Sequence, residues 1–255
     1  MASVTQLACN HLTSPYGYLD DDFGASSAMD NISEIIVIGA PAWSNVTLPG
    51  SIHIYEATDT SINYIKSIDG PSIGSGFGSA VSIDIRGDKI AVTANSISEV
   101  HIYTTNDQLW ETYSTQVISK PGVEKFGHSI SLAYDNSNVL CIGSPSENNV
   151  YVYNDTTLVY TDTNPTDVFN YANVFIIGVD QKIVANDAEE HDKFGGSVAI
   201  SGDYAIVGAY GKDGNRGSVY IFFRTGTTWI FQQKLAENDA TFAYYFGNSV
   251  AISGD

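Results

Sequence analysis

The chain has little of several features that would point directly to a function. Its 255 residues include 2 cysteines, 2 methionines and 7 prolines. It has 11 lysines and arginines but 29 aspartates and glutamates, which gives a net charge of −18. So acidic a chain argues against partners such as nucleic acids or anionic membranes. Two cysteines are too few for a disulfide framework, and we expect Cys9 and Cys141 to be reduced thiols, although the sequence leaves their pairing open.

Long apolar runs and catalytic motifs are missing as well. No stretch approaches the ~18 apolar residues of a membrane-spanning helix, so we expect no membrane insertion. The segment from Met1 to Leu12 lacks the basic and apolar parts of a signal peptide. His-Glu-X-X-His and phosphate-loop motifs do not occur. We therefore expect no catalytic residue and no enzyme activity in this chain.

The chain contains instead a sequence repeat. Phe-Gly pairs begin at residues 23, 77, 126, 194 and 246, with spacings of 54, 49, 68 and 52 residues. Each pair opens a series of short segments rich in β-branched and aromatic residues, separated by Gly-rich turns, which is typical of strands. A period near ~50 residues is typical of a four-stranded β-propeller blade. We expect an all-β fold, a single β-propeller over residues 1–255 with about five blade equivalents, which need not form a complete ring.

The Phe-Gly pairs also divide the chain into units. The clearest unit predicts strands at 197–200, 205–209, 218–222 and 229–235. The predicted units are residues 23–70, 77–118, 126–187 and 194–236, with a partial unit at 246–255. We expect the phenylalanine of each pair to wedge between neighbouring blades.

The repeat is irregular in its third unit and at the two ends of the chain. Residues 169–186 read as a decayed copy, with 181–186 as its second strand, or as part of a hairpin insertion in the third blade. Counting the decayed copy as two strands gives 20 strands, or five blades of four. Val4–Asn10 resembles a fourth strand and Ser249–Ser253 a first strand. Since unpaired edges invite pairing, we expect the ends to share one sheet or to support self-association, and we favour a fragment of a longer propeller.

The segments that follow the Phe-Gly pairs carry a family resemblance. They include Ile-Gly-Ala-Pro at 38–41, Ile-Gly-Ser-Pro at 142–145 and Val-Gly-Ala at 207–209. This pattern resembles the FG-GAP repeat, the blade unit of the integrin α-subunit head and of many bacterial and viral propellers, and it extends from about Asp20 to the end.

The resemblance implies a non-catalytic binding or structural module for adhesion, or for interactions of a surface or virion protein. We therefore expect a location on an extracellular surface or a virus particle. The alternative is the propeller domain of a larger carbohydrate-active or other enzyme whose catalytic part lies outside this chain.

Calcium is the cofactor that the resemblance raises, because integrin-type blades carry an Asp-rich loop between their first and second strands. Here the corresponding turns are Asp30–Glu34, Arg86–Asp88 and Ser201–Asp203, which are too short to supply six oxygen ligands. Asp135–Asn138 is the best remnant of such a loop. We expect no metal and no other cofactor, and we interpret Arg86-Gly87-Asp88 as a structural turn rather than a recognition motif.

A binding surface is the more promising site. In propellers that this chain resembles, ligands meet the loops between strand four and the next strand one, and between strands two and three. Those loops carry aromatic residues among acids, which suit a protein or carbohydrate ligand. The candidate ligand-binding residues are Tyr16, Asp21, Trp43, Tyr210, Arg216 and Tyr244. His53 and His101, in third strands, are expected to pack in the interior, and His128 to lie near the central channel.

Overall fold

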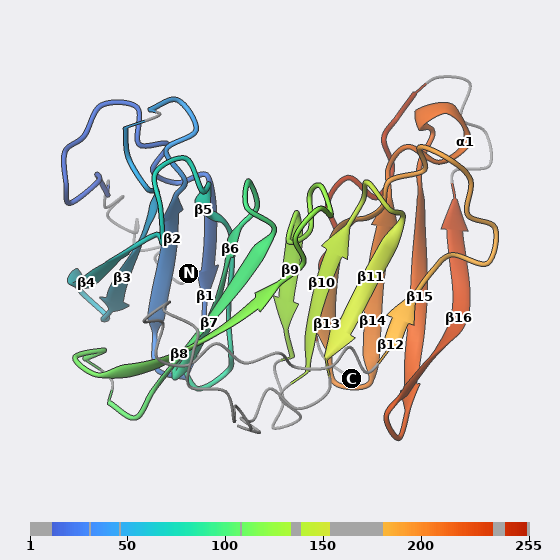
Figure 1. Ribbon diagram of the computed structural model, residues 1–255. Coiled ribbons are helices and arrows are strands. Elements are labelled where there is room, and N and C mark those ends of the chain that lie inside the picture. Colours follow the sequence, from blue (N-terminus) through green and yellow to red (C-terminus); the bar gives the residue numbers. More distant parts are fainter. Residues whose placement is uncertain are drawn as a thin grey trace, which may run out of the picture.

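The fold consists of four sheets, each with four antiparallel strands. The computed structural model describes residues 12–30, 32–45, 47–107, 109–133, 139–153, 181–236 and 243–253. In every sheet the strands pair in chain order, and the sheets follow one another in an open arc (Figure 1). The all-β expectation is confirmed: the model fits a β-propeller of about four to five blades that is not closed. We call the sheets the first to fourth blades.

The first blade consists of β1 (Ser26–Met29), β2 (Ile35–Ala40), β3 (Ser51–Ala57) and β4 (Ile62–Asp69). The second consists of β5 (Phe77–Ile83), β6 (Lys89–Ala94), β7 (Glu99–Thr105) and β8 (Tyr113–Ser119). The third consists of β9 (Ser129–Leu132), β10 (Leu140–Ser144), β11 (Asn149–Tyr153) and β12 (Gln181–Ile183). The fourth consists of β13 (Phe194–Ser201), β14 (Tyr204–Ala209), β15 (Ser218–Thr225) and β16 (Thr228–Ala236).

A short helix, α1 (Lys212–Asn215), lies in the loop between β14 and β15. Asp213, Gly214 and Asn215 have φ angles of 52°, 70° and 71°, so three of its four residues have positive φ and the segment behaves as a turn. Among the described residues, no helix is long and apolar enough to span a membrane.

The interpretation of residues 181–186 as the second strand of a decayed copy is wrong. Strand β12 pairs antiparallel with β11, Tyr151 opposite Lys182, and is therefore the fourth strand of the third blade. The alternative of an insertion agrees with this pairing, because the extra residues then fall between the third and fourth strands of one blade. The count of 20 strands is not reproduced, since the described residues form four sheets of four.

The expected first strand at Ser249–Ser253 is also not reproduced. Only Phe246 pairs there, in an isolated parallel bridge with Gly217. Gly50 and Phe77 form the same bridge between the first and second blades, so Phe246 occupies the place where a next blade would begin. The expected strand Val4–Asn10 lies outside the described residues.

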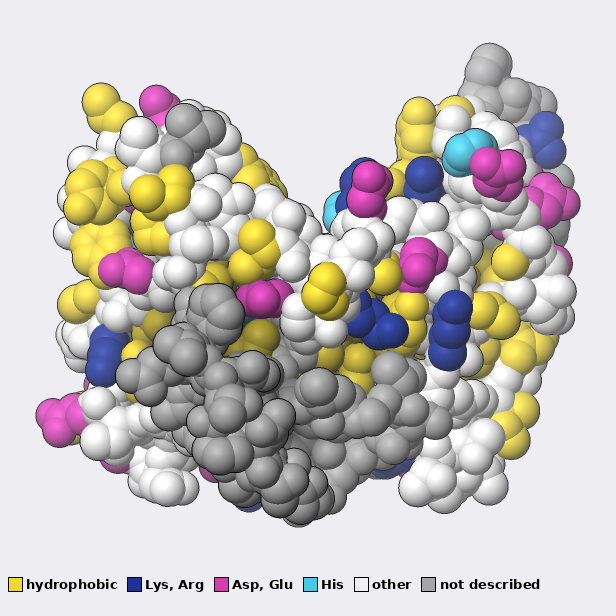
Figure 2. Space-filling view, viewed as in Figure 1, with side chains coloured by type: hydrophobic (Ala, Val, Ile, Leu, Met, Phe, Trp, Pro, Cys, Tyr) yellow, Lys and Arg dark blue, Asp and Glu magenta, His cyan; other side chains and the backbone are white. Residues whose placement is uncertain are grey.

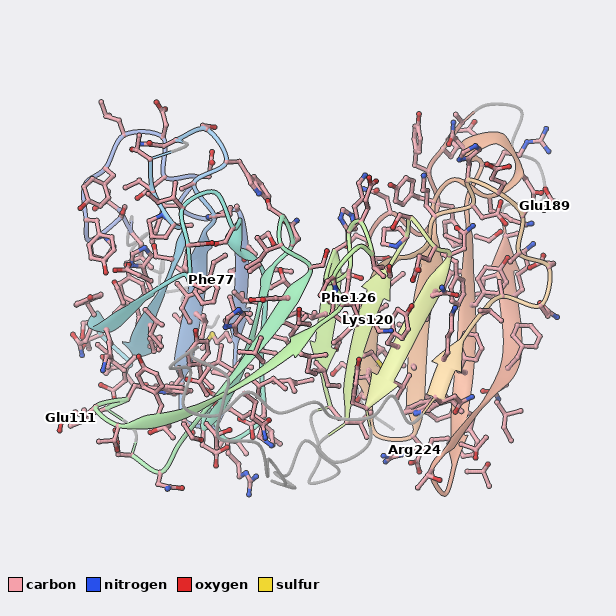
Figure 3. The ribbon with its side chains drawn as sticks, viewed as in Figure 1. Phe77, Glu111, Lys120, Phe126, Glu189 and Arg224 are labelled. Atoms are coloured by element: carbon pink, nitrogen blue, oxygen red, sulfur yellow. The ribbon has the colours of Figure 1, made fainter. Side chains whose placement is uncertain are left out.

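The hydrophobic core lies between consecutive blades. One cluster joins β2 and β3 to β5 and β6, a second joins β6 and β7 to β9 and β10, and a third joins β10 and β11 to β13 and β14. Phe77, Phe126 and Phe194 are fully buried, one in each cluster, and Figure 3 shows Phe77 and Phe126 inside the arc. The predicted wedge between blades is therefore confirmed for these three phenylalanines.

Each phenylalanine also meets the third strand of its own blade. Phe194 contacts the Tyr220 ring at a centroid distance of 5.3 Å, and its backbone N–H donates to Asn148 Oδ1 of the third blade at 3.2 Å. Phe77 meets His101 in the same way at 5.5 Å. One residue thus ties its own blade to the preceding one.

Glycines bring the backbones of consecutive blades into contact. A Cβ on Gly39 would overlap the carbonyl oxygen of Gly78, and Gly143 and Gly208 meet Gly195 and Gly247 in the same way. A serine hydroxyl from the first strand donates to that carbonyl, as Ser129 Oγ does to Gly195 O at 2.9 Å. The same bond joins Ser26 to Gly78 and Ser197 to Gly247, each at 2.8 Å. The glycines of the repeat are therefore required by close backbone approach.

The boundary between the second and third blades is built differently. Ala80 and Thr93 stand where the other blades have the serine and the glycine. The Thr93 hydroxyl accepts from the Ala80 N–H at 2.9 Å, and its methyl group lies against Gly127. A side chain here fills the space that a blade backbone occupies at the other boundaries.

The buried wedge predicts a stability cost. Replacing Phe194 by Ala should lower the free energy of unfolding by about 3–5 kcal/mol, because a fully buried ring is removed between two blades. Denaturant unfolding would measure it. The control is Phe223→Ala, whose ring is 37% exposed and should cost far less. Equal losses in the two variants would contradict the wedge.

The glycine contact makes a second prediction. Gly143→Ala should cost about 3 kcal/mol or more, because a backbone carbonyl cannot move aside without separating the third and fourth blades. Gly202→Ala provides the comparison: Gly202 has φ +53° and open space around it, so the new methyl group costs only the backbone strain of about 1–2 kcal/mol. Thermal unfolding of both variants would show whether the order holds.

Candidate functional site

The structure separates the six candidate ligand-binding residues into two groups. Tyr16, Asp21 and Trp43 lie in loops of the first blade, and Tyr210, Arg216 and Tyr244 lie in loops of the fourth blade or just after it. The two groups of loops stand at opposite ends of the arc, on the same side of the sheets (Figure 1). Hydrophobic side chains gather over the loops of the first blade (Figure 2).

A pocket of about 240 Å³ lies over the first blade. The loop that precedes β1, the loop between β2 and β3, and the end of β4 enclose it. Its lining combines two tyrosines and two carboxylates with small and apolar groups: Tyr16, Tyr18, Asp21, Ala40, Ala42, Leu48, Pro49, Gly50, Ser51 and Asp69. The pocket brings together Tyr16 and Asp21 of the predicted residues. Trp43, 53% exposed, is not part of the lining.

The acidic groups of this pocket differ in exposure. Asp21, expected in an exposed acidic loop, is only 8% exposed, and it accepts hydrogen bonds from the Ser14 hydroxyl and, at 3.1 Å, from the Phe23 N–H. Asp69 is exposed and accepts from the Tyr16 hydroxyl at 3.1 Å. The Tyr16 and Tyr18 rings lie 5.6 Å apart and are tilted by 56°. The pocket thus presents carboxylate oxygens beside aromatic faces.

His53 lies beneath this pocket and is fully buried, as its place in β3 predicted. Its Nε2 is 3.0 Å from Ser51 Oγ, its Nδ1 is 2.6 Å from Ser67 Oγ, and its ring packs against Tyr16 at 5.3 Å. Burial lowers the pKa of His53 to about 4, although the negative charges of Asp21 and Asp69 oppose this. The imidazole is therefore neutral at pH 7.

The fourth blade carries an ion-pair network at the corresponding place, which the sequence did not lead us to expect. Lys212 Nζ is 3.0 Å from Asp192 Oδ2 and also donates to the Asp187 carbonyl at 2.6 Å. Burial acts to lower the pKa of Lys212, but its hydrogen bond to Asp192 and the nearby acids outweigh this, so the pKa is raised. Asp187 also accepts from Tyr220 and Lys234, at 2.7 and 2.6 Å. The network holds the loop before β13, which includes Glu189 of Figure 3, against α1.

Of the remaining candidate residues, Arg216 and Tyr244 are exposed and Tyr210 is half-buried. The Tyr210 ring lies 6.5 Å from Tyr245, and Tyr244 is 58% exposed. Arg216 is exposed, and its carbonyl accepts the Phe246 N–H at 3.0 Å. These residues form a surface and line no part of the pocket over the first blade.

The turns considered for calcium have other structural uses. Asp30 is 1% exposed, and its carboxylate accepts the N–H groups of Ile32, Ser33 and Ile35 at 2.6–2.9 Å. Asp135–Asn138 lies outside the described residues. Within the part of the chain that the structure describes, no group of three or more His, Cys, Asp or Glu residues could hold a metal ion.

The Arg-Gly-Asp segment packs against the neighbouring blade. A Cβ on Gly87 would meet Asp30 Oδ2 at 2.8 Å, and the Arg86 carbonyl accepts a hydrogen bond from the Ser33 hydroxyl. The Asp88 N–H donates to Asp84 at 3.1 Å, which closes the turn. These contacts support its interpretation as a structural turn.

Neither His101 nor His128 lines the pocket over the first blade. His101 is 6% exposed, and its Nε2 lies 3.0 Å from Glu99 Oε2. Burial, followed by the charge of Lys125, lowers the pKa of His128. His128 directly precedes β9, at the entrance to a first strand.

The buried His53 predicts a pH dependence. In the unfolded chain it takes up a proton near pH 6.5, whereas in the fold its pKa is about 4. The contribution of neutral His53 to stability is therefore complete above pH 6.5 and is lost as the pH falls towards 4, on the order of 3 kcal/mol. Denaturant unfolding between pH 4 and 7 should show a shallower slope for His53→Phe than for the original chain. Identical slopes would contradict the buried neutral histidine.

The use of Asp30 as a turn residue predicts that calcium leaves stability unchanged. Millimolar calcium or a chelator should leave the melting temperature unaltered, because a ligand raises it only by binding the folded state. A rise of several degrees with calcium would show that one of the short turns does bind the ion.

Comparison with known proteins bears on the fold. The model of the FG-GAP repeat matches residues 178–222, which run from just before β12 into β15. No curated protein matches the chain. A functionally unknown protein from Desulfotomaculum acetoxidans is similar in structure, with a TM-score of 0.54 and 11% identity over 88% of this chain and 59% of that one. Hsv2p from Kluyveromyces lactis has a TM-score of 0.49 and 14% identity over 84% of this chain and 61% of that one.

The chain thus spans about 60% of the length of these two solved structures. Together, the repeat match and the four four-stranded sheets are consistent with a propeller of FG-GAP type.

Proposed function

We propose that this chain is a non-catalytic binding module that holds a protein or carbohydrate ligand in the pocket over the first blade, in adhesion or in an interaction of a surface or virion protein. The observation that carries the proposal is the lining of that pocket, in which Tyr16 and Tyr18 stand beside Asp21 and Asp69. Aromatic faces and fixed hydrogen-bonding groups in one concave site are the usual composition of a ligand pocket. Trp43 and Leu19 are exposed on the same loops, at 53% and 84%, and would extend the contact surface.

Among the residues that the structure describes near the pocket, Ser51 with His53 resembles catalytic machinery, since Ser51 Oγ is 3.0 Å from His53 Nε2. The repeat favours a structural role for this pair, because Glu99 with His101 occupies the same two positions of the second blade, and Asn149 with Tyr151 those of the third. A carboxylate that orients the histidine is the usual third member of such a site, and here Ser67 stands at Nδ1. A fluorophosphonate probe should therefore leave the protein unlabelled, and labelling at Ser51 would overturn the non-catalytic proposal.

Selection of ligands on the folded protein would test the binding role. A phage-displayed peptide library and a glycan array would be probed with the chain, and bound members retested on two single variants. Tyr18→Ala removes a pocket wall that is 52% exposed, and Tyr244→Ala removes a tyrosine of the fourth blade that is 58% exposed. Both should fold, because each side chain is half in solvent.

We expect ligands to lose at least tenfold in affinity on Tyr18→Ala and to keep their affinity on Tyr244→Ala. The reverse result would place the site on the loops of the fourth blade. Selected ligands that bind both variants as well as the original chain, or the absence of any selected ligand, would contradict the proposal.

A further inference from the structure

The first and fourth blades can be compared residue by residue around one buried aspartate. Asp21 and Asp192 each lie two residues before the phenylalanine of a Phe-Gly pair, and they are 8% and 3% exposed. The carbonyl of Asp21 accepts the Ala42 N–H at 3.0 Å, and that of Asp192 accepts the Gly211 N–H at 2.9 Å. The same backbone hydrogen bond therefore closes both loops. The residue that follows its N–H donor is Trp43 in the first blade and Lys212 in the fourth blade.

In the fourth blade this aspartate is neutralised from within the chain. Lys212, 3% exposed, places its ammonium 3.0 Å from Asp192 Oδ2. A second lysine, Lys234, lies opposite Tyr220 in β15 and binds Asp187. Burial of a carboxylate is costly unless a charge or several hydrogen bonds compensate for it, and for Asp192 the compensation comes from Lys212 and from the Glu189 N–H, which donates to Asp192 Oδ2 at 2.7 Å.

In the first blade both lysines are replaced. Trp43 stands at the place of Lys212, and Ser67, opposite His53 in β3, stands at the place of Lys234. Asp21 accepts hydrogen bonds from two neutral donors, the Ser14 hydroxyl and the Phe23 N–H. The pocket of about 240 Å³ adjoins this carboxylate, and its described lining contains a second carboxylate, Asp69, but no lysine or arginine.

We propose that this pocket binds a primary alkylammonium group, such as the side chain of a lysine on a partner protein, in the position relative to Asp21 that Lys212 Nζ holds relative to Asp192. The nitrogen binds Asp21, and Asp69 supplies a second carboxylate. The alkyl chain lies along Ala42, Leu48 and Pro49, and the Tyr16 and Tyr18 rings, which line the same pocket, are within reach of the cation. This inference rests on the proposed binding function and names the chemistry of its ligand.

The test uses small probes on the whole chain. Nα-acetyl-lysine methyl ester and n-butylammonium would be titrated by NMR or calorimetry, with Nα-acetyl-norleucine methyl ester as the uncharged control. We expect both amines to bind, the norleucine ester to bind at least tenfold more weakly, and Asp21→Asn to lose at least tenfold in affinity for the amines. If butylammonium binds and the lysine ester does not, the site takes a small free amine and the lysine assignment is overturned. Equal binding of the norleucine and lysine esters, or no binding of either amine, would overturn the ammonium site itself.

A second variant keeps the test decisive if Asp21→Asn does not fold. Trp43→Lys supplies an internal ammonium at the position of Lys212, so it should abolish amine binding and raise the melting temperature. Amine binding that persists in this variant would contradict the equivalence of the two blades. Failure of the ammonium proposal can be distinguished from failure of the proposed binding function. If the selected peptides or glycans depend on Tyr18 but carry no cation, the binding function stands and only the ammonium chemistry is refuted.

Discussion

The close approach of two backbones, found at every blade boundary except the one between the second and third blades, is the constraint on which most of this structure depends. At three boundaries, a glycine in the second strand of one blade lies against the carbonyl of the glycine in the Phe-Gly pair that follows. One of these boundaries joins the fourth blade to the segment that follows it. A serine hydroxyl binds the same carbonyl. This contact sets the distance between sheets, and that distance lets Phe77 and Phe194 fill the space beyond it. A side chain at the glycine would separate the blades and expose the clusters around these rings.

Much of this fold follows from the sequence because the constraint recurs. The Phe-Gly pairs located the start of every described blade, and segments rich in β-branched and aromatic residues, bounded by Gly-rich turns, located the strands between them. The failure lies at β12, because Gln181–Ile183 has the composition of any short strand and nothing local distinguishes a second strand from a fourth. Its partner, β11, is separated from it by the residues between Tyr153 and Gln181. Pairing across such an interval is a tertiary property that strand propensity does not encode.

The candidate site was less predictable, for a different reason. Loop position identified Tyr16 and Asp21, which line the pocket. It also identified Trp43, which lies on one of the same loops but outside the lining. The importance of Asp21 comes from its counterpart Asp192. Both stand two residues before a repeat phenylalanine, so the equivalence was visible in the sequence. The partner of Asp192 was not, because Lys212 reaches it from a loop nearly twenty residues away in the chain.

The pairing of strands in chain order has a consequence for how the protein is made. Each strand binds a neighbour that left the ribosome shortly before it, so a blade can assemble during synthesis without waiting for distant segments. The third blade is the exception, since β11 ends at Tyr153 and its partner β12 begins only at Gln181. During that interval β11 has a free edge, and such edges invite pairing with other chains. The third blade therefore keeps a free strand edge for longer during synthesis than the other three blades, whose consecutive strands are joined by short loops.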